Sequence, residues 1–387
     1  MASKHVTYEY LRTPCVLLDL ERLDANIHEM TKHAVDAGVS LRPHTKVHQS
    51  AWIAQRQLEA GACGIEVGTI EQAETMANEG LHDIVVAHPL FGDQKLATLK
   101  SIALNPRNSL CMVVDMAEQA HGIASVGRAI GSDIPVLLKI DTGGSPRYGV
   151  QPGEPAVKLA VELARIGGIR LVGVYGHEKG AKNTGEGLRD RAIEDATMIC
   201  DTARAIREAG LEIHHVSVGA SPTFRQTCSL LKEGRFREIT EIHPGNCVIG
   251  DIGYMMNGAN TLDSCAVTVL SAVMSVSHDS YAVLDMGIKT LGADSLIAKR
   301  DTPGFFWEGM PSYGSVRGRP GLWLGRLHAE SSCIHYKDPQ ERLELGERLE
   351  IVPNNATLVI NLHSKLHGVR NGEVERIVQV TGRGAGS

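Results

Sequence analysis

Hydrophobic and polar positions alternate between two periodicities along residues 39–243. Short runs that are apolar at nearly every position, such as 84–87 and 135–138, predict strands buried on both faces, as parallel strands are. Between these runs, apolar residues recur at three- and four-residue spacings, which predicts amphipathic helices. We therefore expect alternating strands and helices, with strands at 39–44, 64–69, 83–88, 109–115, 134–141, 169–177, 213–219 and 238–243.

Eight parallel strands with intervening helices fit a closed (β/α)8 TIM barrel, whose usual size is roughly 250 residues. An open doubly wound sheet is the competing architecture, but no Gly-x-Gly-x-x-Gly motif follows the first strand. We expect a barrel over residues 21–261. Its helices are predicted at about 20–37, 50–59, 71–78, 94–104, 117–130, 154–166, 188–209 and 224–233.

The pattern changes after residue 262, where apolar positions recur with a period of two and predict a C-terminal β domain, 262–387. A hairpin is expected to turn at Asn371-Gly372, because this dipeptide favours a type I′ turn. Residues 294–319, rich in Gly and Pro, predict a long loop. The other strands of the domain are expected at 266–276, 281–284, 322–326, 348–352 and 357–361.

Composition and charge narrow the functional classes. With 43% apolar and 22% charged residues and a net charge of −6, the chain is expected to be a packed protein without a general nucleic-acid surface. No apolar run is long enough for a signal peptide or a membrane helix. The eight cysteines form no Cys-x-x-Cys pair, so we expect a reducing, cytoplasmic location with neither disulfides nor a zinc ribbon.

The residues after each barrel strand are the candidates for chemistry, because active sites of this architecture lie at the carboxyl ends of the strands. Lys46 follows the first strand, in the segment Arg42-Pro43-His44-Thr45-Lys46-Val47-His48. Cationic neighbours would disfavour its ammonium form, and a neutral amine is what Schiff-base chemistry requires. The alternative is a solvated basic loop.

Further polar and small residues follow the later strands. Arg147 comes after the fifth strand, and Tyr175 and His177 end the sixth. Small-residue turns after the last two strands can cradle a phosphate with main-chain N–H groups and the start of a helix near Thr223. These turns contain Ser217, Gly219, Ala220, Ser221, Gly245 and Asn246. A lysine, an arginine, a tyrosine and a phosphate cradle on one rim describe a pyridoxal phosphate pocket.

With these motifs the chain resembles the fold-type III pyridoxal phosphate enzymes, alanine racemase-like in their barrel. Within them it is similar to the family of D-threonine aldolase, D-serine dehydratase and 3-hydroxy-D-aspartate aldolase. The likeness covers nearly the whole chain. It rests on 13–19, on Arg42-Pro43-His44-Thr45-Lys46, on Arg147-Tyr148-Gly149-Val150, and on 217–223, 284–289 and 383–384.

The resemblance implies pyridoxal 5'-phosphate as cofactor, a small-molecule amino-acid substrate and a homodimer. It implies that Lys46 forms the Schiff base beside His44, that Arg147 lies near the cofactor's phenolate or ring, and that Tyr175 contacts the ring. It also places residues 1–20 with the β domain. The phosphate is then held by Ser217, Gly219, Ala220, Ser221, Gly245 and Asn246.

One segment departs from the family. Members that cleave or dehydrate β-hydroxy amino acids usually carry His-x-Cys or His-x-Asp after a Val-Pro pair, and these residues bind a divalent metal. Here Val352-Pro353 is followed by Asn355 and Thr357 at the ligand positions. Amide and hydroxyl oxygens are poor substitutes for imidazole and thiolate, so we expect no such metal. His363 lies nearby and could supply a base or another ligand.

The family implies a pyridoxal phosphate-dependent lyase of D-β-hydroxy amino acids, of aldolase or dehydratase type. His177 and His363 are the candidates for handling the substrate hydroxyl. The altered metal positions favour an alternative, a metal-independent racemase or epimerase. A non-catalytic cofactor-binding protein is the third possibility, although such proteins resemble a barrel alone.

Overall fold

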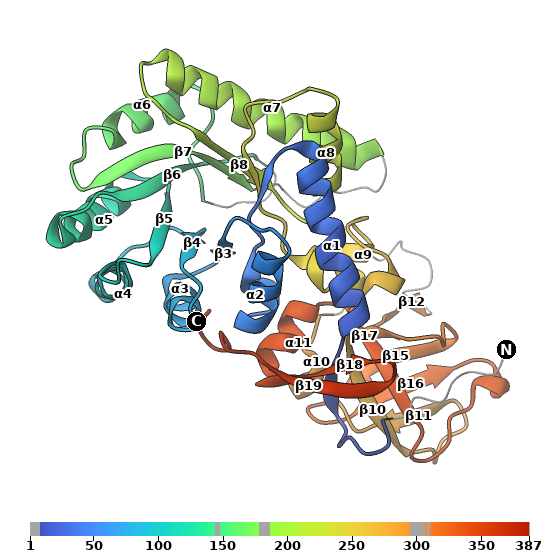
Figure 1. Cartoon of the computed structure of the whole chain (residues 1–387). Helices are drawn as coiled ribbons and strands as arrows, with labels where there is room; N and C mark the ends of the chain where they lie inside the picture. The colour runs from blue at the N-terminus through green and yellow to red at the C-terminus, as the bar shows by residue number, and fades with distance from the viewer. Residues whose placement is uncertain (1–7, 144–147, 178–185, 295–305, 308–309, 387) are drawn as a thin grey trace. The chain divides into compact units, whose positions relative to one another are not determined.

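The computed structural model describes residues 8–143, 148–177, 186–294, 306–307 and 310–386 (Figure 1). Contacts divide the chain into two units. One contains Ile27–Gly245 with the residues after Arg383, and the other contains Asn246–Arg383 with the residues up to Asn26. Within the described ranges, no helix combines the length and the apolar character that crossing a bilayer requires.

The first unit is built on a parallel sheet of eight strands in the order β2-β9-β8-β7-β6-β5-β4-β3. A parallel bridge between His44 and Glu66 joins the two ends of this order, so the sheet closes into a barrel. The TIM-barrel prediction is thus confirmed. The strands are β2 (Ser40–Leu41), β3 (Ile65–Val67), β4 (Asp83–Val86), β5 (Ser109–Val114), β6 (Ile134–Ile140), β7 (Ile169–His177), β8 (His215–Gly219) and β9 (Glu241–Ile242).

A helix follows each strand from β3 to β8, as the sequence predicts, and α2 follows the β2 turn. The first helix, α1, buries the apolar face expected for it, with Leu23 and Met30 almost without exposed surface, and Gly38 follows it at φ +65°. The helices are α1 (Leu20–Ala37), α2 (Ala51–Glu59), α3 (Ile70–Asn78), α4 (Asp93–Ala103), α5 (Ala117–Ile130), α6 (Glu154–Leu163), α7 (Glu186–Glu208) and α8 (Phe224–Lys232).

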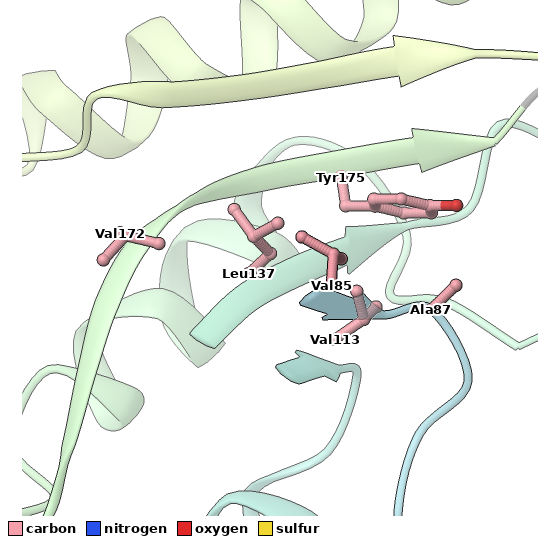
Figure 2. Packing of buried hydrophobic residues seen from close by; sticks show 6 residues of the cluster. All are labelled: Val85, Ala87, Val113, Leu137, Val172 and Tyr175. Atoms are coloured by element: carbon pink, nitrogen blue, oxygen red, sulfur yellow. The ribbon is translucent and has the colours of Figure 1, made fainter. Parts of the chain in front are cut away.

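Apolar side chains fill part of the barrel interior. Figure 2 shows that they point toward one another from β4, β5, β6 and β7, and that the ring of Tyr175 belongs to the same cluster. Burial of each Val or Leu side chain in this cluster stabilises the barrel by roughly 1.5–3 kcal/mol. The cluster consists of Val85, Ala87, Val113, Leu137, Val172 and Tyr175.

The second unit contains a mainly antiparallel sheet in the order β11-β16-β15-β14-β17-β10-β1-β18-β19, in which β10 also pairs with β11 and closes a ring. Asn371 (φ 51°) and Gly372 (φ 81°) make the predicted hairpin turn. The strands are β1 (Cys15–Asp19), β10 (Val267–Ser275), β11 (Tyr281–Leu284), β14 (Gly314–Val316), β15 (Leu322–Leu327), β16 (Ser332–Tyr336), β17 (Arg348–Pro353), β18 (Lys365–Arg370) and β19 (Glu373–Gln379). Short helices α9 (Ile252–Met255), α10 (Ile288–Leu291) and α11 (Ala356–Leu362) lie in the same part of the chain.

Two predictions for this unit are wrong. Residues 357–361 belong to helix α11, not to a strand, because the Asn355 side chain caps the helix by accepting a hydrogen bond from the N–H of Leu358 (3.2 Å). The predicted loop 294–319 contains strands in its described part: β12 (Phe306–Trp307) pairs with β13 (Met310–Pro311), and β14 joins the main sheet. These strands are too short to give a periodic sequence signal.

Candidate active site

Lys46 lies in the turn that follows β2, on the short 3-10 helix η1 (Thr45–Val47), and its side chain is half-buried. The Nδ1 atom of His44 accepts a hydrogen bond from the main-chain N–H of Lys46 (3.5 Å). The hydroxyl of Thr45 donates to the carbonyl oxygen of Glu66 (3.0 Å). These contacts fix the Lys46 turn against β3 at the carboxyl end of the barrel.

The sequence neighbours predicted to surround Lys46 with positive charge are paired with carboxylates or neutral. The guanidinium of Arg42 donates to Oε2 of Glu241 (2.8 Å) and to Oδ1 of Asp83 (2.7 Å). Burial lowers the pKa of His44 well below its usual value and that of His48 to about 4, so both imidazoles are neutral at neutral pH. The carboxylates that neutralise Arg42 lie far from it in sequence, and the local motif gave no sign of them.

Glu66, in the middle of β3, is a carboxyl group with no exposed surface. The hydroxyl of Tyr175 donates to its Oε1 atom (2.9 Å), and Nε2 of His44 lies 3.4 Å from the same oxygen. Burial raises the pKa of Glu66 to about 8, against the opposing effects of the Tyr175 hydrogen bond and the charge of Lys46. A carboxyl group with this pKa changes charge close to neutral pH, within the electrostatic reach of Lys46.

Aromatic rings gather beside this carboxyl group. The rings of Tyr175 and His243 are stacked, with centroids 4.4 Å apart and planes at 8°, and the ring of His177 lies 5.8 Å from that of His243. The ammonium of Lys139 lies 4.2 Å from the centroid of Tyr175. Burial, together with the charges of Lys139 and Lys46, lowers the pKa of His243, so this ring is neutral.

One ring nitrogen of the neutral His243 accepts no hydrogen bond from the residues that the structure describes. The Ser217 hydroxyl donates its proton to Oε1 of Glu241 (2.9 Å). In the contact between Ser217 Oγ and His243 Nδ1 (2.9 Å), Ser217 must therefore accept, so the proton of the neutral imidazole is on Nδ1. The remaining nitrogen, Nε2, is buried and has no hydrogen-bond partner among the residues that the structure describes. A buried unpaired acceptor is costly, so this nitrogen fits a site that a bound ligand would complete.

The turns after β2, β9 and β8 lie side by side and are joined by hydrogen bonds. The N–H of His44 donates to the carbonyl oxygen of Pro244 (3.0 Å), and the N–H of Gly245 donates to Oγ of Ser221 (3.1 Å). A Cβ atom on Gly219 would lie only 2.9 Å from the main-chain nitrogen of His243. The Lys46 turn and the two small-residue turns therefore form one continuous surface.

The turn between β8 and α8 suits a phosphate. Helix α8 begins at Phe224, and its N-cap, Thr223, makes no side-chain capping hydrogen bond. The buried Thr223 hydroxyl has no partner in the described part of the chain. A hydroxyl and a helix amino terminus at the end of a barrel strand are the groups that bind phosphate. The residues at this end of the barrel therefore fit a cofactor with a phosphate group and an amine-reactive aldehyde.

Three of the predicted site residues are not part of this surface as described. Arg147 lies outside the described residues. Asn246 directly follows Gly245 but belongs to the second unit, where its amide donates to Oδ2 of Asp251 (2.9 Å). His363 also belongs to the second unit, where Nε2 lies 3.0 Å from the carbonyl oxygen of Thr290.

Asn355, at one of the two positions where the family usually carries metal ligands, has other partners. Asn355 accepts the capping hydrogen bond of α11 with Oδ1 and donates to Oδ2 of Asp294 with Nδ2 (3.2 Å). The ranges covered by the structure contain no group of three or more His, Cys, Asp or Glu side chains arranged to hold a metal ion. The amide of Asn355 therefore has a structural use in the second unit.

Glu66, Lys139, Glu241 and His243 were not among the residues predicted from the sequence, although they surround the site. Each is a single polar residue in a strand of otherwise apolar residues or directly after one. A charged residue in a strand that is buried on both faces requires a partner inside the barrel. The sequence shows these polar residues in apolar strands, but it does not show which of them contact one another in the barrel.

Comparison with known proteins agrees with this geometry. Residues 18–252 match the family model "Alanine racemase, N-terminal domain", and residues 266–369 match "Putative serine dehydratase domain". The chain is 28% identical to a D-threonine aldolase of Arthrobacter sp. over 96% of this chain and 93% of that protein. It is 31% identical to a D-threo-3-hydroxyaspartate dehydratase of Delftia sp. (strain HT23) over 89% and 91%.

The solved structures agree as well. The crystal structure of D-threonine aldolase from Filomicrobium marinum superposes with a TM-score of 0.84 at 30% identity and covers 97% of this chain and 96% of its own. The similarity thus extends over both units, beyond the barrel. The chain belongs to the alanine racemase-like, fold-type III family of pyridoxal phosphate enzymes, in the group that contains D-threonine aldolase, 3-hydroxyaspartate aldolase and dehydratase, and D-serine dehydratase.

Proposed function

We propose that this chain is a pyridoxal phosphate-dependent lyase that cleaves or dehydrates a β-hydroxy amino acid of the D configuration. The observation that carries the proposal is the continuous surface formed by the turns after β2, β9 and β8. Lys46 lies on one of these turns. Another carries the Thr223 hydroxyl, which has no hydrogen-bond partner among the described residues. Full-length relatives named as D-threonine aldolase and D-threo-3-hydroxyaspartate dehydratase support the reaction class.

The residues for holding the cofactor follow from these contacts. The phosphate would be bound by main-chain N–H groups around Gly219 and Ala220, by the hydroxyls of Ser221 and Thr223, and by the amino terminus of α8, with Gly245 holding Ser221 in place through its own N–H. The side-chain amide of Asn246 donates to Asp251, so Asn246 would contribute its main chain. Lys46 would supply the amine, Tyr175 and His44 would border the ring, and Arg147 is proposed beside the ring on family resemblance alone.

Pyridoxal phosphate supplies an electron sink that weakens the bond at Cα lying perpendicular to its ring. The protein must then move a proton at the β-hydroxyl group of the substrate. His177 is the better candidate, because its ring lies in the same barrel as Lys46 and 5.8 Å from the ring of His243. For His363, the contact of Nε2 with Thr290 leaves Nδ1 as the nitrogen for such a role.

A screen of D- and L-3-hydroxy amino acids, scored for aldehyde, keto acid and enantiomer, tests the proposal. An aldolase releases an aldehyde, and a dehydratase releases a keto acid and ammonia, in both cases from D isomers only. Product from L isomers alone would contradict the assignment. No product and no spectral change with any substrate would instead indicate a non-catalytic cofactor-binding protein.

A metal-independent racemase or epimerase is the second candidate. The observation that favours it is the use of Asn355 as a helix cap and as a donor to Asp294, at a position where lyases of the family usually carry a metal-binding histidine. Enantiomer exchange without aldehyde or keto acid would support this candidate. In either case, we expect treatment with a chelator to change the rate less than about twofold, and loss of activity that Mn²⁺ or Zn²⁺ restores would overturn that expectation.

A further inference from the structure

Glu66 makes several contacts inside the barrel. A cofactor could be attached to Lys46 without them. It is the central residue of β3, has no exposed surface, and faces the barrel interior between a turn and three other strands. Burying a carboxyl group costs several kcal/mol unless it is neutral or well paired. The neighbours of Glu66 therefore determine what its buried carboxyl group does.

The Oε1 atom of Glu66 contacts the donor groups of His44 and Tyr175. The Nδ1 atom of His44 accepts from the main-chain N–H of Lys46, so the proton of this neutral imidazole is on Nε2, which faces Glu66 Oε1 at 3.4 Å. The hydroxyl of Tyr175 donates to the same oxygen at 2.9 Å. A single carboxyl oxygen thus orients the ring of His44 and the phenol of Tyr175.

The other oxygen is available for a proton. Oε2 is buried, lies 3.9 Å from Nδ1 of His243, and has no hydrogen-bond partner within the described ranges. The proton on Nδ1 of His243 is directed to Ser217, 2.9 Å away. Oε2 can therefore take up or lose a proton without breaking the contacts that Oε1 makes.

The charges that face Glu66 come from every element packed against it. Lys46 on η1 and Lys139 on β6 favour the ionised carboxylate, whereas burial and the charge of Glu241 on β9 oppose it. Tyr175 on β7 and the neutral rings of His44 and His243 complete the surroundings. Because electrostatic coupling is reciprocal, the charge of Glu66 must stabilise the ammonium form of Lys46 as much as Lys46 stabilises the carboxylate.

We propose that Glu66 is a positioning residue of the Lys46 site: it orients Tyr175 and His44 through one oxygen, and in its ionised form it stabilises the ammonium form of Lys46. This role rests on the proposed function, in which the Lys46 amine reacts with the cofactor.

The test is the pH titration of the Lys46 amine in the cofactor-free protein. The protein is labelled briefly with acetic anhydride over a series of pH values, and acetylation of the Lys46 peptide is quantified by mass spectrometry. Glu66→Gln keeps a carbonyl oxygen for Tyr175 and His44 but removes the charge. Its titration midpoint should fall by about one pH unit, a tenfold change in neutral amine. Glu66→Asp, which retains a carboxyl group, should stay closer to the wild type.

The matched control is Glu79→Gln, which removes one exposed carboxylate just after α3 and should leave the midpoint unchanged. The reciprocal variant, Lys46→Met, tests the same coupling if Glu66→Gln does not fold. The infrared carbonyl band of protonated Glu66 should then persist to a higher pH than in the wild type.

An unchanged midpoint in folded Glu66→Gln, or an unchanged carbonyl band in Lys46→Met, overturns the role of Glu66. These outcomes are distinct from failure of the proposed function. If borohydride reduction with pyridoxal phosphate attaches no label to Lys46 in the wild type, the proposed function fails whatever the titration gives.

Discussion

At the scale of single residues, two glutamates in the barrel interior differ in their hydrogen-bond partners. Glu241 accepts hydrogen bonds from Arg42 (2.8 Å) and Ser217 (2.9 Å), so its carboxyl group is paired with a guanidinium. Among the described residues, the donors that contact Glu66 are the neutral groups of Tyr175 and His44, and burial raises the pKa of Glu66 to about 8. The charge of Glu66 can therefore change near neutral pH.

We expect Glu66 to make the stability of the protein fall as the pH rises. The folded chain holds a proton on Glu66 up to a pH of about 8, whereas the unfolded chain loses it near its ordinary value of about 4.3. The stability given by the neutral carboxyl group is complete below the unfolded pKa and is lost as the pH rises through the folded one. The largest slope is about 1.4 kcal/mol per pH unit.

Glu66→Gln removes this slope, so its melting temperature relative to the wild type should rise by a few degrees between pH 5 and pH 8. Thermal denaturation followed by circular dichroism measures the difference, with Glu79→Gln as the control. A difference that stays constant over this range would show that Glu66 is ionised in the folded protein.

The sequence predicted the turn that carries Lys46, because Pro43 ends a short apolar strand and polar residues follow it. The electrostatics of that turn could not be predicted from it. Glu241 and Asp83, which neutralise Arg42, lie at distant positions in the chain, and only the closed barrel brings them to it. Local sequence therefore located the lysine but not the charges around it.

At the scale of elements, the closely packed turns after β8 and β9 determine where a phosphate could bind. The main chain at Gly219 approaches that of His243 so closely that a Cβ atom would lie 2.9 Å from its nitrogen. Gly245 has a similar constraint, since a Cβ atom there would lie 3.0 Å from the carbonyl oxygen of His44. These contacts explain why small residues occur in both turns.

Gly219→Ala should weaken the affinity for pyridoxal phosphate about tenfold, or ~1.4 kcal/mol, because the added methyl group forces the two turns apart. Titration of the cofactor-free protein with pyridoxal phosphate, followed by absorbance, measures the change. Gly167→Ala is the matched control, since no atom lies within 4 Å of a Cβ atom there. Equal affinities in the two variants would exclude the β8 turn from the cofactor site.

Periodicity predicted the barrel helices and strands to within a few residues, because most of them are long or strongly apolar. It failed at α11, where Thr357, Val359 and Ile360 favour a strand. The capping hydrogen bond from the N–H of Leu358 to Asn355 outweighs that local preference. It also missed β16, although Cys333 and His335 are half-buried and alternate there with buried residues.

At the scale of the whole molecule, the two units match two family models, at residues 18–252 and 266–369, and relatives align over both. The boundaries predicted from sequence, 21–261 for the barrel and 1–20 with 262–387 for the β domain, stay a prediction. Domain boundaries are set by contacts distant in sequence, which periodicity does not record.

A homodimer is predicted from the family resemblance, with each site near the β domain of the partner. Light scattering after size-exclusion chromatography should give twice the chain mass of 41.7 kDa. A mass of one chain, with full cofactor binding, would mean that the site does not require a partner.

The most direct test of the proposed function is to find the lysine that carries the cofactor. The protein is mixed with pyridoxal phosphate, reduced with borohydride and digested, and the modified peptide is identified by mass spectrometry. We predict one modification, on Lys46, and its loss in Lys46→Ala. Modification of another lysine, such as Lys139 or Lys289, or an adduct that persists in Lys46→Ala, would contradict the assignment.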